Sequence, residues 1–159
     1  MTEQEFQLLP EVLIESEDLF VEGSVNPDII ADITDRWSTE RSIGAHTVFL
    51  GRVRADRHEE GTVSAIEFTT HREMAEKALR NLMIRVAGEH STDRTLLFVQ
   101  HGLGVIPVGG IPVAVCVATG HRGQAFAICS GILEALKSEV PIYGKELFDN
   151  AGHRWKVNS

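Results

Sequence analysis

A buried strand that leads through a glycine turn into a long helix is the feature that most constrains how this chain can fold. Residues 113–118 read VAVCVA, and such a continuous apolar run is typical of a central strand. Thr119-Gly120 supplies a turn, and Pro141 stops the helix that follows. We therefore predict a strand over 113–118 and a helix over 122–138, whose inward-facing residues are Ala125, Phe126, Cys129, Ile132, Leu133 and Leu136.

Cationic side chains stand at both ends of this predicted helix. His121 and Arg122 open it, where backbone N–H groups and the helix dipole favour an anion, and Lys137 lies in its last turn. A phosphate or a carboxylate is the ligand that we expect at the N-terminus of this helix. The alternative is purely structural: His121 is a cap, Arg122 is solvated, and Lys137 complements the dipole.

Length and composition favour one domain. The 159 residues can bury a core without disulfides, and Cys116 and Cys129 lack CxxC spacing, so we expect two buried free thiols.

The chain has 15 basic and 23 acidic residues and a formal charge of -8, which argues against a nucleic-acid partner. We find no apolar run long enough to span a membrane and no secretory signal, and we expect a cytoplasmic protein.

The first half of the chain suggests an arm, a helix and two strands. Residues 1–25 are acidic with at best a short strand at 11–15, and we expect an N-terminal arm or edge strand before a single domain over 26–159. Asn26-Pro27-Asp28 is a helix start, and apolar spacing predicts a helix over 26–37. Strands are predicted over 44–53 and 62–69, joined as a hairpin through the polar loop 54–61.

The second half completes an α+β chain. Apolar residues that include Met74 recur at helical spacing and predict a helix over 72–87, followed by a buried strand over 95–101. With strand 62–69 these elements suggest a right-handed βαβ unit. Residues 102–112 are rich in glycine and proline, and we expect tight turns there. The fold class is therefore α+β, with helices packed on a mixed sheet.

Other cationic residues extend the candidate site. Lys145 follows Pro141 in an apolar segment, where a lysine can acquire a lowered pKa, so Lys137 and Lys145 are candidates for acid–base or acyl chemistry if they converge. Arg52 and Arg54 share one face if their strand continues that far. Each of these residues also fits an ordinary solvated position. Histidines are scattered without metal-ligand spacing and no nucleotide-binding motif is present, so neither a metal nor a cofactor is expected.

Taken together, these pieces resemble the large, catalytic subunit of molybdopterin synthase. The matching positions span about residues 44–149: Gly44-Ala45, Phe49-Leu50-Gly51-Arg52-Val53-Arg54, Glu67, Met74-Ala75-Glu76-Lys77, His101-Gly102-Leu103-Gly104, His121-Arg122, Ala125-Phe126, Leu136-Lys137 and Val140-Pro141-Ile142. The resemblance implies an α/β hammerhead fold with a small extra β-subdomain. It also implies a homodimer that carries a small ubiquitin-like sulfur-carrier subunit at each end, forming a heterotetramer.

The resemblance further implies a reaction and a set of site residues. The carrier's Gly-Gly C-terminus, as a thiocarboxylate, would deliver sulfur to cyclic pyranopterin monophosphate and build the dithiolene of molybdopterin. Lys137 and Lys145 would be catalytic, and Phe49 and Leu133 would form an apolar wall. The expected substrate-binding residues are Arg52, Arg54, His121, Arg122, Gly144 and Glu146.

The sequence departs from the family pattern at Gly144. The family usually has an aromatic residue followed by one or two lysines after the Pro-Ile step, and here Tyr143 is followed by glycine and then Lys145. One alternative is thus a non-catalytic paralogue that binds the carrier or a pterin without turnover. Another is an unrelated α+β phosphate-binding module with no affinity for a carrier.

Overall fold

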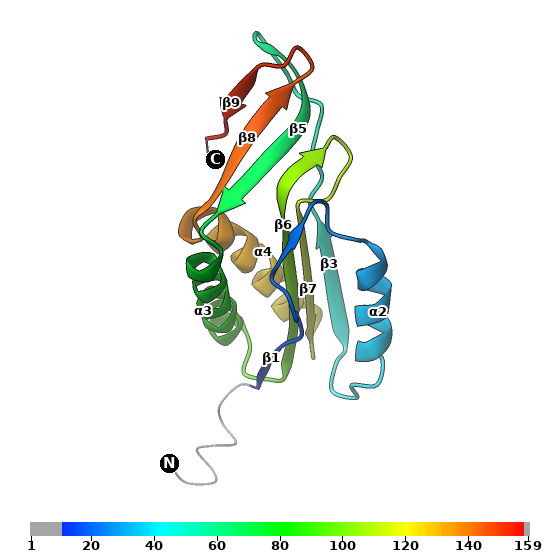
Figure 1. The fold of residues 1–159 in the computed structure, drawn as a ribbon. Helices are drawn as coiled ribbons and strands as arrows, with labels where there is room; N and C mark the ends of the chain where they lie inside the picture. Colours follow the sequence, from blue (N-terminus) through cyan, green and yellow to red (C-terminus); the bar gives the residue numbers. More distant parts are fainter. Residues whose placement is uncertain (1–10, 158–159) are drawn as a thin grey trace.

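The computed structural model describes residues 11–157 as one mixed sheet with three helices (Figure 1). The sheet has nine strands in this part of the chain, and its main path runs β3-β7-β6-β5-β8-β9 with antiparallel neighbours. These strands are β3 (Ala45–Leu50), β5 (Gly61–Thr70), β6 (Thr95–Pro107), β7 (Val113–Thr119), β8 (Ile142–Phe148) and β9 (His153–Trp155). The α+β class and the mixed sheet are confirmed.

The three remaining strands pair off this path. β1 (Val12–Ile14) and β2 (Phe20–Glu22) both lie parallel to β6, and β4 (Arg57–His58) pairs with the start of β5. The hydroxyl of Ser16 between β1 and β2 accepts a hydrogen bond from the backbone N–H of Val99 at 2.8 Å. Residues 11–25 of the expected N-terminal arm are therefore built into the sheet, and residues 1–10 lie outside the described residues.

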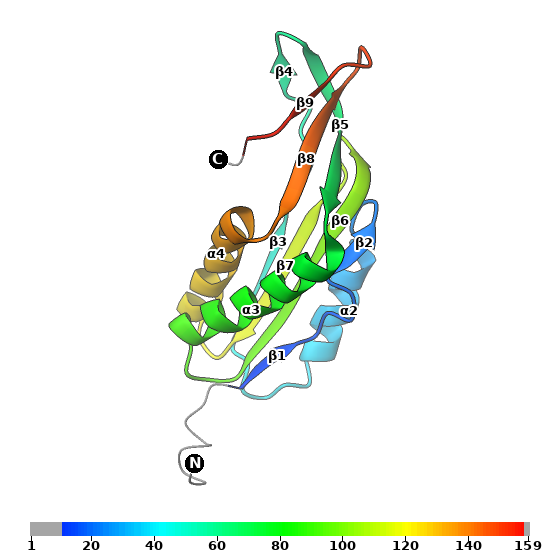
Figure 2. The same ribbon diagram turned by 60° about the vertical axis from the view of Figure 1, so that its left-hand side comes forward.

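The helices cover the sheet on two faces (Figures 1 and 2). α3 (Arg72–His90) and α4 (Arg122–Glu139) pack against one face, and α2 (Asp28–Trp37) packs against the other. Because side chains alternate along a strand, Leu97 and Val99 of β6 belong to the α3–α4 core while Phe98 belongs to the α2 core. The three predicted helices are confirmed to within a few residues at their ends.

Two residues placed in the core by helical spacing are instead exposed. Met74 in α3 is 60% exposed and Phe126 in α4 is 64% exposed, so both predictions are wrong. In each helix the adjacent alanine, Ala75 or Ala125, is fully buried, so Met74 and Phe126 lie on the side of the first turn that faces away from the core. The cysteines follow expectation, since Cys116 and Cys129 are buried and free, and burial raises the pKa of the Cys116 thiol to about 12.

β6 is much longer than predicted and serves two parts of the sheet. Its first portion pairs with β7, and residues 104–107 pair with β5 beyond a bend at Gly104, whose φ is +83°. Position 102 requires a glycine, because an added Cβ would collide with the carbonyl oxygen of Gly23 beside β2. The prediction of tight turns over 102–112 is wrong for residues 102–107, where the glycines serve close packing and a bend inside a strand, and is confirmed just after β6, where the N–H of Gly110 donates to the carbonyl oxygen of Pro107 at 2.8 Å.

Both predicted supersecondary units were also wrong. β3 pairs with β7 rather than with β5, so no hairpin joins the two strands. The β5–α3–β6 segment links antiparallel strands, because β5 lies beside the far portion of β6, and it is therefore not a βαβ unit. In the first case β7, from a distant part of the chain, occupies the position expected for β5, and in the second case β5 and β6 are neighbours but run in opposite directions.

A small β-subdomain extends beyond the helices (Figures 1 and 2). It comprises β4, β5, β8 and β9, and Phe148 packs there with Val63, Ile66 and Ile106. This feature agrees with the extra β-subdomain that the resemblance implies. None of the helices in the described part of the chain is both long and apolar enough to cross a membrane.

Candidate functional site

The start of α4 has the geometry that the sequence predicts. β7 ends at Thr119, whose hydroxyl donates to the carbonyl oxygen of His121 at 2.7 Å, and His121 is the extended residue before the helix. The His121 side chain makes no capping hydrogen bond, so its structural alternative as a cap is not supported. His121 and Arg122 are exposed beside the free N–H groups of the first turn, an arrangement able to bind an anion.

Lys137 lies at the opposite end of the same helix. It is an exposed residue of the last turn, fifteen positions after Arg122. A rise of 1.5 Å per residue separates the two positions by about 22 Å along the axis. Within one chain, α4 therefore does not bring these two cationic side chains together.

β8 distributes its polar residues over two faces. Lys145 lies between Glu67 of β5 and Trp155 of β9, with Nζ at 3.3 Å from the Glu67 carboxylate and 5.4 Å from the Trp155 ring centre. Glu146 points to the opposite face, because neighbouring strand residues alternate. The structure consequently separates the predicted catalytic Lys145 from the predicted substrate-binding Glu146 and Gly144.

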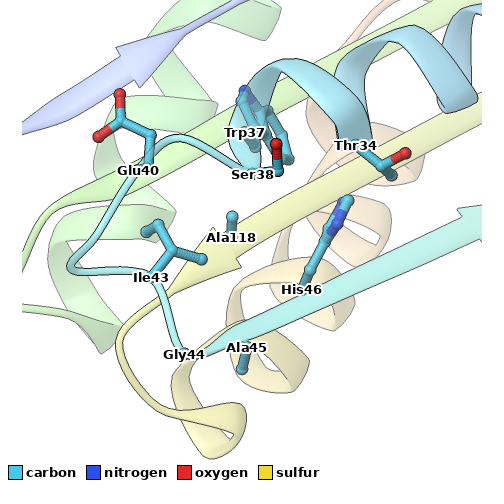
Figure 3. Close-up of a pocket in the computed structure, with 9 residues that line it drawn as sticks. All are labelled: Thr34, Trp37, Ser38, Glu40, Ile43, Gly44, Ala45, His46 and Ala118. Atoms are coloured by element: carbon cyan, nitrogen blue, oxygen red, sulfur yellow. The ribbon is translucent and has the colours of Figure 1, made fainter.

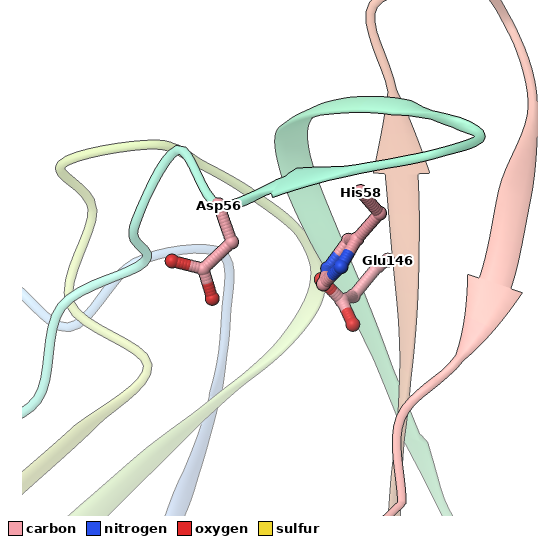
Figure 4. A group of neighbouring side chains, drawn as sticks. All are labelled: Asp56, His58 and Glu146. Atoms are coloured by element: carbon pink, nitrogen blue, oxygen red, sulfur yellow. The ribbon is translucent and has the colours of Figure 1, made fainter.

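Glu146 belongs to a charged cluster in the β-subdomain (Figure 4). Glu146 is 7% exposed, its carboxylate lies 3.1 Å from Nε2 of His58, and Asp56 offers a third ligand atom within 4.8 Å. These are ligand types that a divalent metal accepts. Arg154 lies 3.9 Å from Glu146, however, and Arg54 lies 3.4 Å from Asp56, so guanidinium groups already balance both carboxylates. We interpret the cluster as ion pairs that fasten β4 and β9 onto β8.

The two candidate arginines follow β3 instead of lying within it. Because β3 ends at Leu50, the argument that Arg52 and Arg54 share a strand face is wrong. Arg52 donates from Nη1 to the carbonyl oxygen of Gly109 at 2.7 Å, and the side chain of Arg54 is 82% exposed. Phe49 is half-exposed on β3, while Leu133 packs against the α3–α4 core, so the two expected wall residues differ in environment.

A cavity of about 220 Å³ opens at the edge of the β-subdomain. It is lined by Ile142, Tyr143, Gly144, Trp155 and Lys156. Gly144 is the predicted site residue among them. Trp155 and Lys156 were missed by the sequence analysis, because neither position belongs to a recognisable motif and their proximity to Gly144 depends on the pairing of β9 with β8.

A second cavity, of about 270 Å³, lies between α2 and the start of β3 (Figure 3). The ring of His46 packs against that of Trp37 with 4.9 Å between centres, and burial lowers the pKa of His46. The indole N–H of Trp37 has no hydrogen-bond partner in the described part of the chain. None of the predicted site residues lines this cavity.

Known proteins share both this sequence pattern and this fold. The model of the family described as MoaE protein matches residues 25–139. A molybdopterin synthase catalytic subunit from Aspergillus fumigatus is 30% identical over 136 residues, which cover 86% of this chain and 69% of that protein. The Ralstonia nicotianae protein of the same name is 38% identical over 128 residues, covering 80% of this chain and 70% of that protein.

Solved structures agree. The MoaE protein from Burkholderia ambifaria has a TM-score of 0.68 at 27% identity, with 95% of this chain and 92% of that chain covered. Molybdopterin synthase from Staphylococcus aureus shares the fold with a TM-score of 0.72 at 24% identity, over 95% of this chain and 97% of that chain. A protein–protein complex of subunits 1 and 2 of molybdopterin-converting factor from Helicobacter pylori contains a chain with the same fold, at a TM-score of 0.69 and 16% identity over 91% of this chain and 88% of that one.

A mixed sheet with two helices on one face, a protruding β-subdomain and a cationic strand–turn–helix defines a class of molybdenum cofactor biosynthesis proteins. The chain belongs to the MoaE family. The predicted role as a sulfurtransferase of molybdenum cofactor biosynthesis is thereby confirmed at the level of the family. The alternative of an unrelated phosphate-binding module is excluded.

Proposed function

We propose that this chain catalyses sulfur transfer from the C-terminal thiocarboxylate of a small carrier protein to cyclic pyranopterin monophosphate. Repeated transfer yields the dithiolene of molybdopterin. The observation that carries the proposal is the match of residues 25–139 to the MoaE family, because it includes the cationic helix α4 from end to end. The two-subunit complex from Helicobacter pylori supports a small protein partner for the present chain as well.

The proposed active site is shared between two copies of the chain. Arg122 and Lys137 stand about 22 Å apart along one helix, and a pterin phosphate is much smaller than this separation. In a homodimer, the helix start of one copy can face the helix end of the other. His121 and Arg122 then hold the phosphate of the substrate, and Lys137 from the second copy acts on the acyl end of the carrier.

The remaining predicted residues keep proposed roles in the same site. Lys145 contributes its ammonium group once it leaves Glu67, and the apolar wall consists of Phe49 and Leu133. Substrate contacts are assigned to Arg52, Arg54 and Gly144, and the buried Glu146 supports the site through its contacts with His58 and Arg154. The scheme uses neither a metal nor a cofactor, and the free thiols of Cys116 and Cys129 suit a reducing compartment such as the cytoplasm.

Reconstitution tests the activity directly. Purified full-length chain is mixed with a thiocarboxylated carrier and the cyclic precursor, and dithiolene product is quantified after oxidation to a fluorescent pterin. We expect product formation, and we expect Lys137→Ala to lower the rate by a factor of about 100 or more because an acid–base group is lost. Lys77→Ala, which removes an exposed lysine of α3, serves as the matched control and retains the wild-type rate.

A non-catalytic carrier-binding subunit is the alternative function, and Gly144 is the observation that favours it. The family usually has a lysine at this step of the sequence, and glycine removes that amine. Wild-type protein that binds the thiocarboxylated carrier but forms no dithiolene would establish this alternative and disprove the enzymatic proposal.

A further inference from the structure

Lys156 occupies the space that a side chain at position 144 would fill. Its backbone N–H donates to the carbonyl oxygen of Gly144 at 2.8 Å, which extends the contact of β9 with β8 by one step. A Cβ added to Gly144 would stand 3.3 Å from Cδ of Lys156 and 3.3 Å from the ring of Phe68. The aliphatic stem of Lys156 thus lies over Gly144, and a Cβ at this position would make a tight contact with the stem.

Lys145 does not lie beside Gly144 in this structure. It emerges on the opposite face of β8, where the carboxylate of Glu67 and the ring of Trp155 hold it. Lys156 and Gly144, by contrast, line the same cavity of about 220 Å³. The amine nearest to Gly144 is therefore delivered by the C-terminal strand and not by the next residue of β8.

The lining of this cavity fits a slender chain that ends in one negative charge. The rest of the lining comes from Ile142, Tyr143 and Trp155, of which the two aromatic residues are 59% and 56% exposed. Among the described lining residues, Lys156 alone carries a charge. One ammonium group matches a monoanionic carboxylate, whereas a phosphate dianion calls for several donors or a guanidinium fork.

We propose that Lys156 is a substrate-binding residue that receives the C-terminal carboxylate or thiocarboxylate of the carrier tail in this cavity. The inference rests on the proposed function, since it takes the carrier as the occupant. The cavity begins at Ile142, just after the end of α4, so the bound tail lies near the helix end that carries Lys137. Lys156 binds and orients the acyl group while Lys137 performs the transfer chemistry.

Peptide binding tests the role of Lys156 without requiring turnover. The probes are a fluorescein-labelled peptide of carrier-tail sequence ending in Gly-Gly with a free carboxylate, and the same peptide with a C-terminal amide. The full-length protein should bind the carboxylate form about tenfold more tightly, the value of one charge-assisted hydrogen bond. We expect Lys156→Ala to abolish this preference, Lys156→Arg to preserve most of it, and Lys77→Ala to leave it unchanged.

A relocation variant separates loss of the ammonium group from loss of structure. In the double variant Gly144→Lys, Lys156→Ala, the stem that crosses Gly144 is gone and a lysine at 144 can enter the same cavity. We expect the carboxylate preference to return in this variant. Circular dichroism and thermal unfolding of each variant verify the fold.

The outcomes distinguish this inference from the proposed function. A carboxylate preference that survives in Lys156→Ala, or that the wild type lacks, overturns the role of Lys156 even if dithiolene is formed. A preference that disappears in Lys156→Ala and returns in the double variant upholds that role even if the wild type forms no dithiolene.

Discussion

His101 is an ionisable side chain enclosed almost completely by apolar and aromatic neighbours. It is 5% exposed and packs against the rings of Phe20 and Phe68, with ring centres at 6.2 and 5.0 Å. Burial lowers the pKa of His101 from 6.5 to about 4, although a hydrogen bond from Nδ1 to the carbonyl oxygen of Gly102 acts in the opposite direction. The imidazole is therefore neutral in the folded protein at pH 7.

The lowered pKa of His101 predicts a specific loss of stability in acid. Between pH 6.5 and about 4 the unfolded chain binds a proton at His101 and the folded chain does not, so the free energy of unfolding falls as the pH falls through this window. The full effect is about 3 kcal/mol. Urea unfolding of wild type and His101→Gln at several pH values measures it.

The comparison of the two proteins isolates this residue from other titrating groups. We expect His101→Gln to be less stable than wild type at pH 7.5, because the aromatic packing is lost, but to lose less stability on acidification. A difference in unfolding free energy between the two proteins that stays constant from pH 7.5 to 4 would contradict the assignment.

At the level of single elements, the parallel contact between β2 and β6 depends on a glycine. Gly102 lies opposite Val21, and a Cβ there would collide with the backbone carbonyl of Gly23 and approach the side chain of Ile106. We expect Gly102→Ala to lower the free energy of unfolding by about 2–3 kcal/mol, since neither the strand nor the core residue can move freely. Denaturant unfolding provides the measurement.

Gly88→Ala is the matched control for this substitution. Gly88 lies in α3, and an added Cβ there meets no atom within 4 Å. The better helix propensity of alanine should leave the protein equally stable or stabilise it by up to about 1 kcal/mol. Equal effects of the two substitutions would show that the close approach of β2 and β6 contributes little to stability.

Local pattern predicted some elements well and others not at all. β7 and α4 were predicted because a continuous apolar run, a glycine turn and helical spacing agree with one another. β8 was missed because IYGKELF contains a glycine and two charges, and its pairing with β5 joins residues far apart in the chain. The partners of β1 and β2 depend on similar long-range contacts, which a periodic pattern does not encode.

The candidate site shows the same division between local and distant information. The cationic residues at the start of α4, His121 and Arg122, and the lysine of its last turn could be predicted because they belong to one helix. The proximity of Lys156 to Gly144 could not be predicted from the sequence, because it depends on the pairing of β9 with β8. The opposite faces of Lys145 and Glu146 become evident only once residues 142–148 are known to form a strand.

At the scale of the whole molecule, the proposed site between two copies of the chain predicts complementation. Arg122→Ala and Lys137→Ala proteins are each expected to lose at least about 90% of dithiolene formation, since each removes a charged group from every site. When the two inactive proteins are mixed and allowed to exchange subunits, half of the dimers are mixed. Each mixed dimer contains one site with both wild-type residues, so we expect recovery of about one quarter of the wild-type rate.

The recovery must depend on subunit exchange. Two controls should stay inactive. One is the mixture of both variants assayed before subunits have exchanged, and the other is Lys137→Ala protein carried alone through the exchange procedure. If the exchanged mixture also remains inactive while native mass spectrometry shows mixed dimers, Arg122 and Lys137 do not form one site between the copies.

The bend at Gly104 has a consequence for how the molecule opens. β6 is the one strand of the main sheet path that pairs with β7, β1 and β2 over its first portion and with β5 over its last four residues. Detachment of the subdomain at residues 104–107 would break the hydrogen bonds between β5 and β6, so we expect the amides of this pairing to exchange with deuterated solvent before the amides of 95–101, which stay protected until the entire chain unfolds. The cavity beside Gly144 lies in this subdomain, so the proposed site for the carrier tail belongs to a part of the protein that can separate from β6 while the body carrying α4 stays folded.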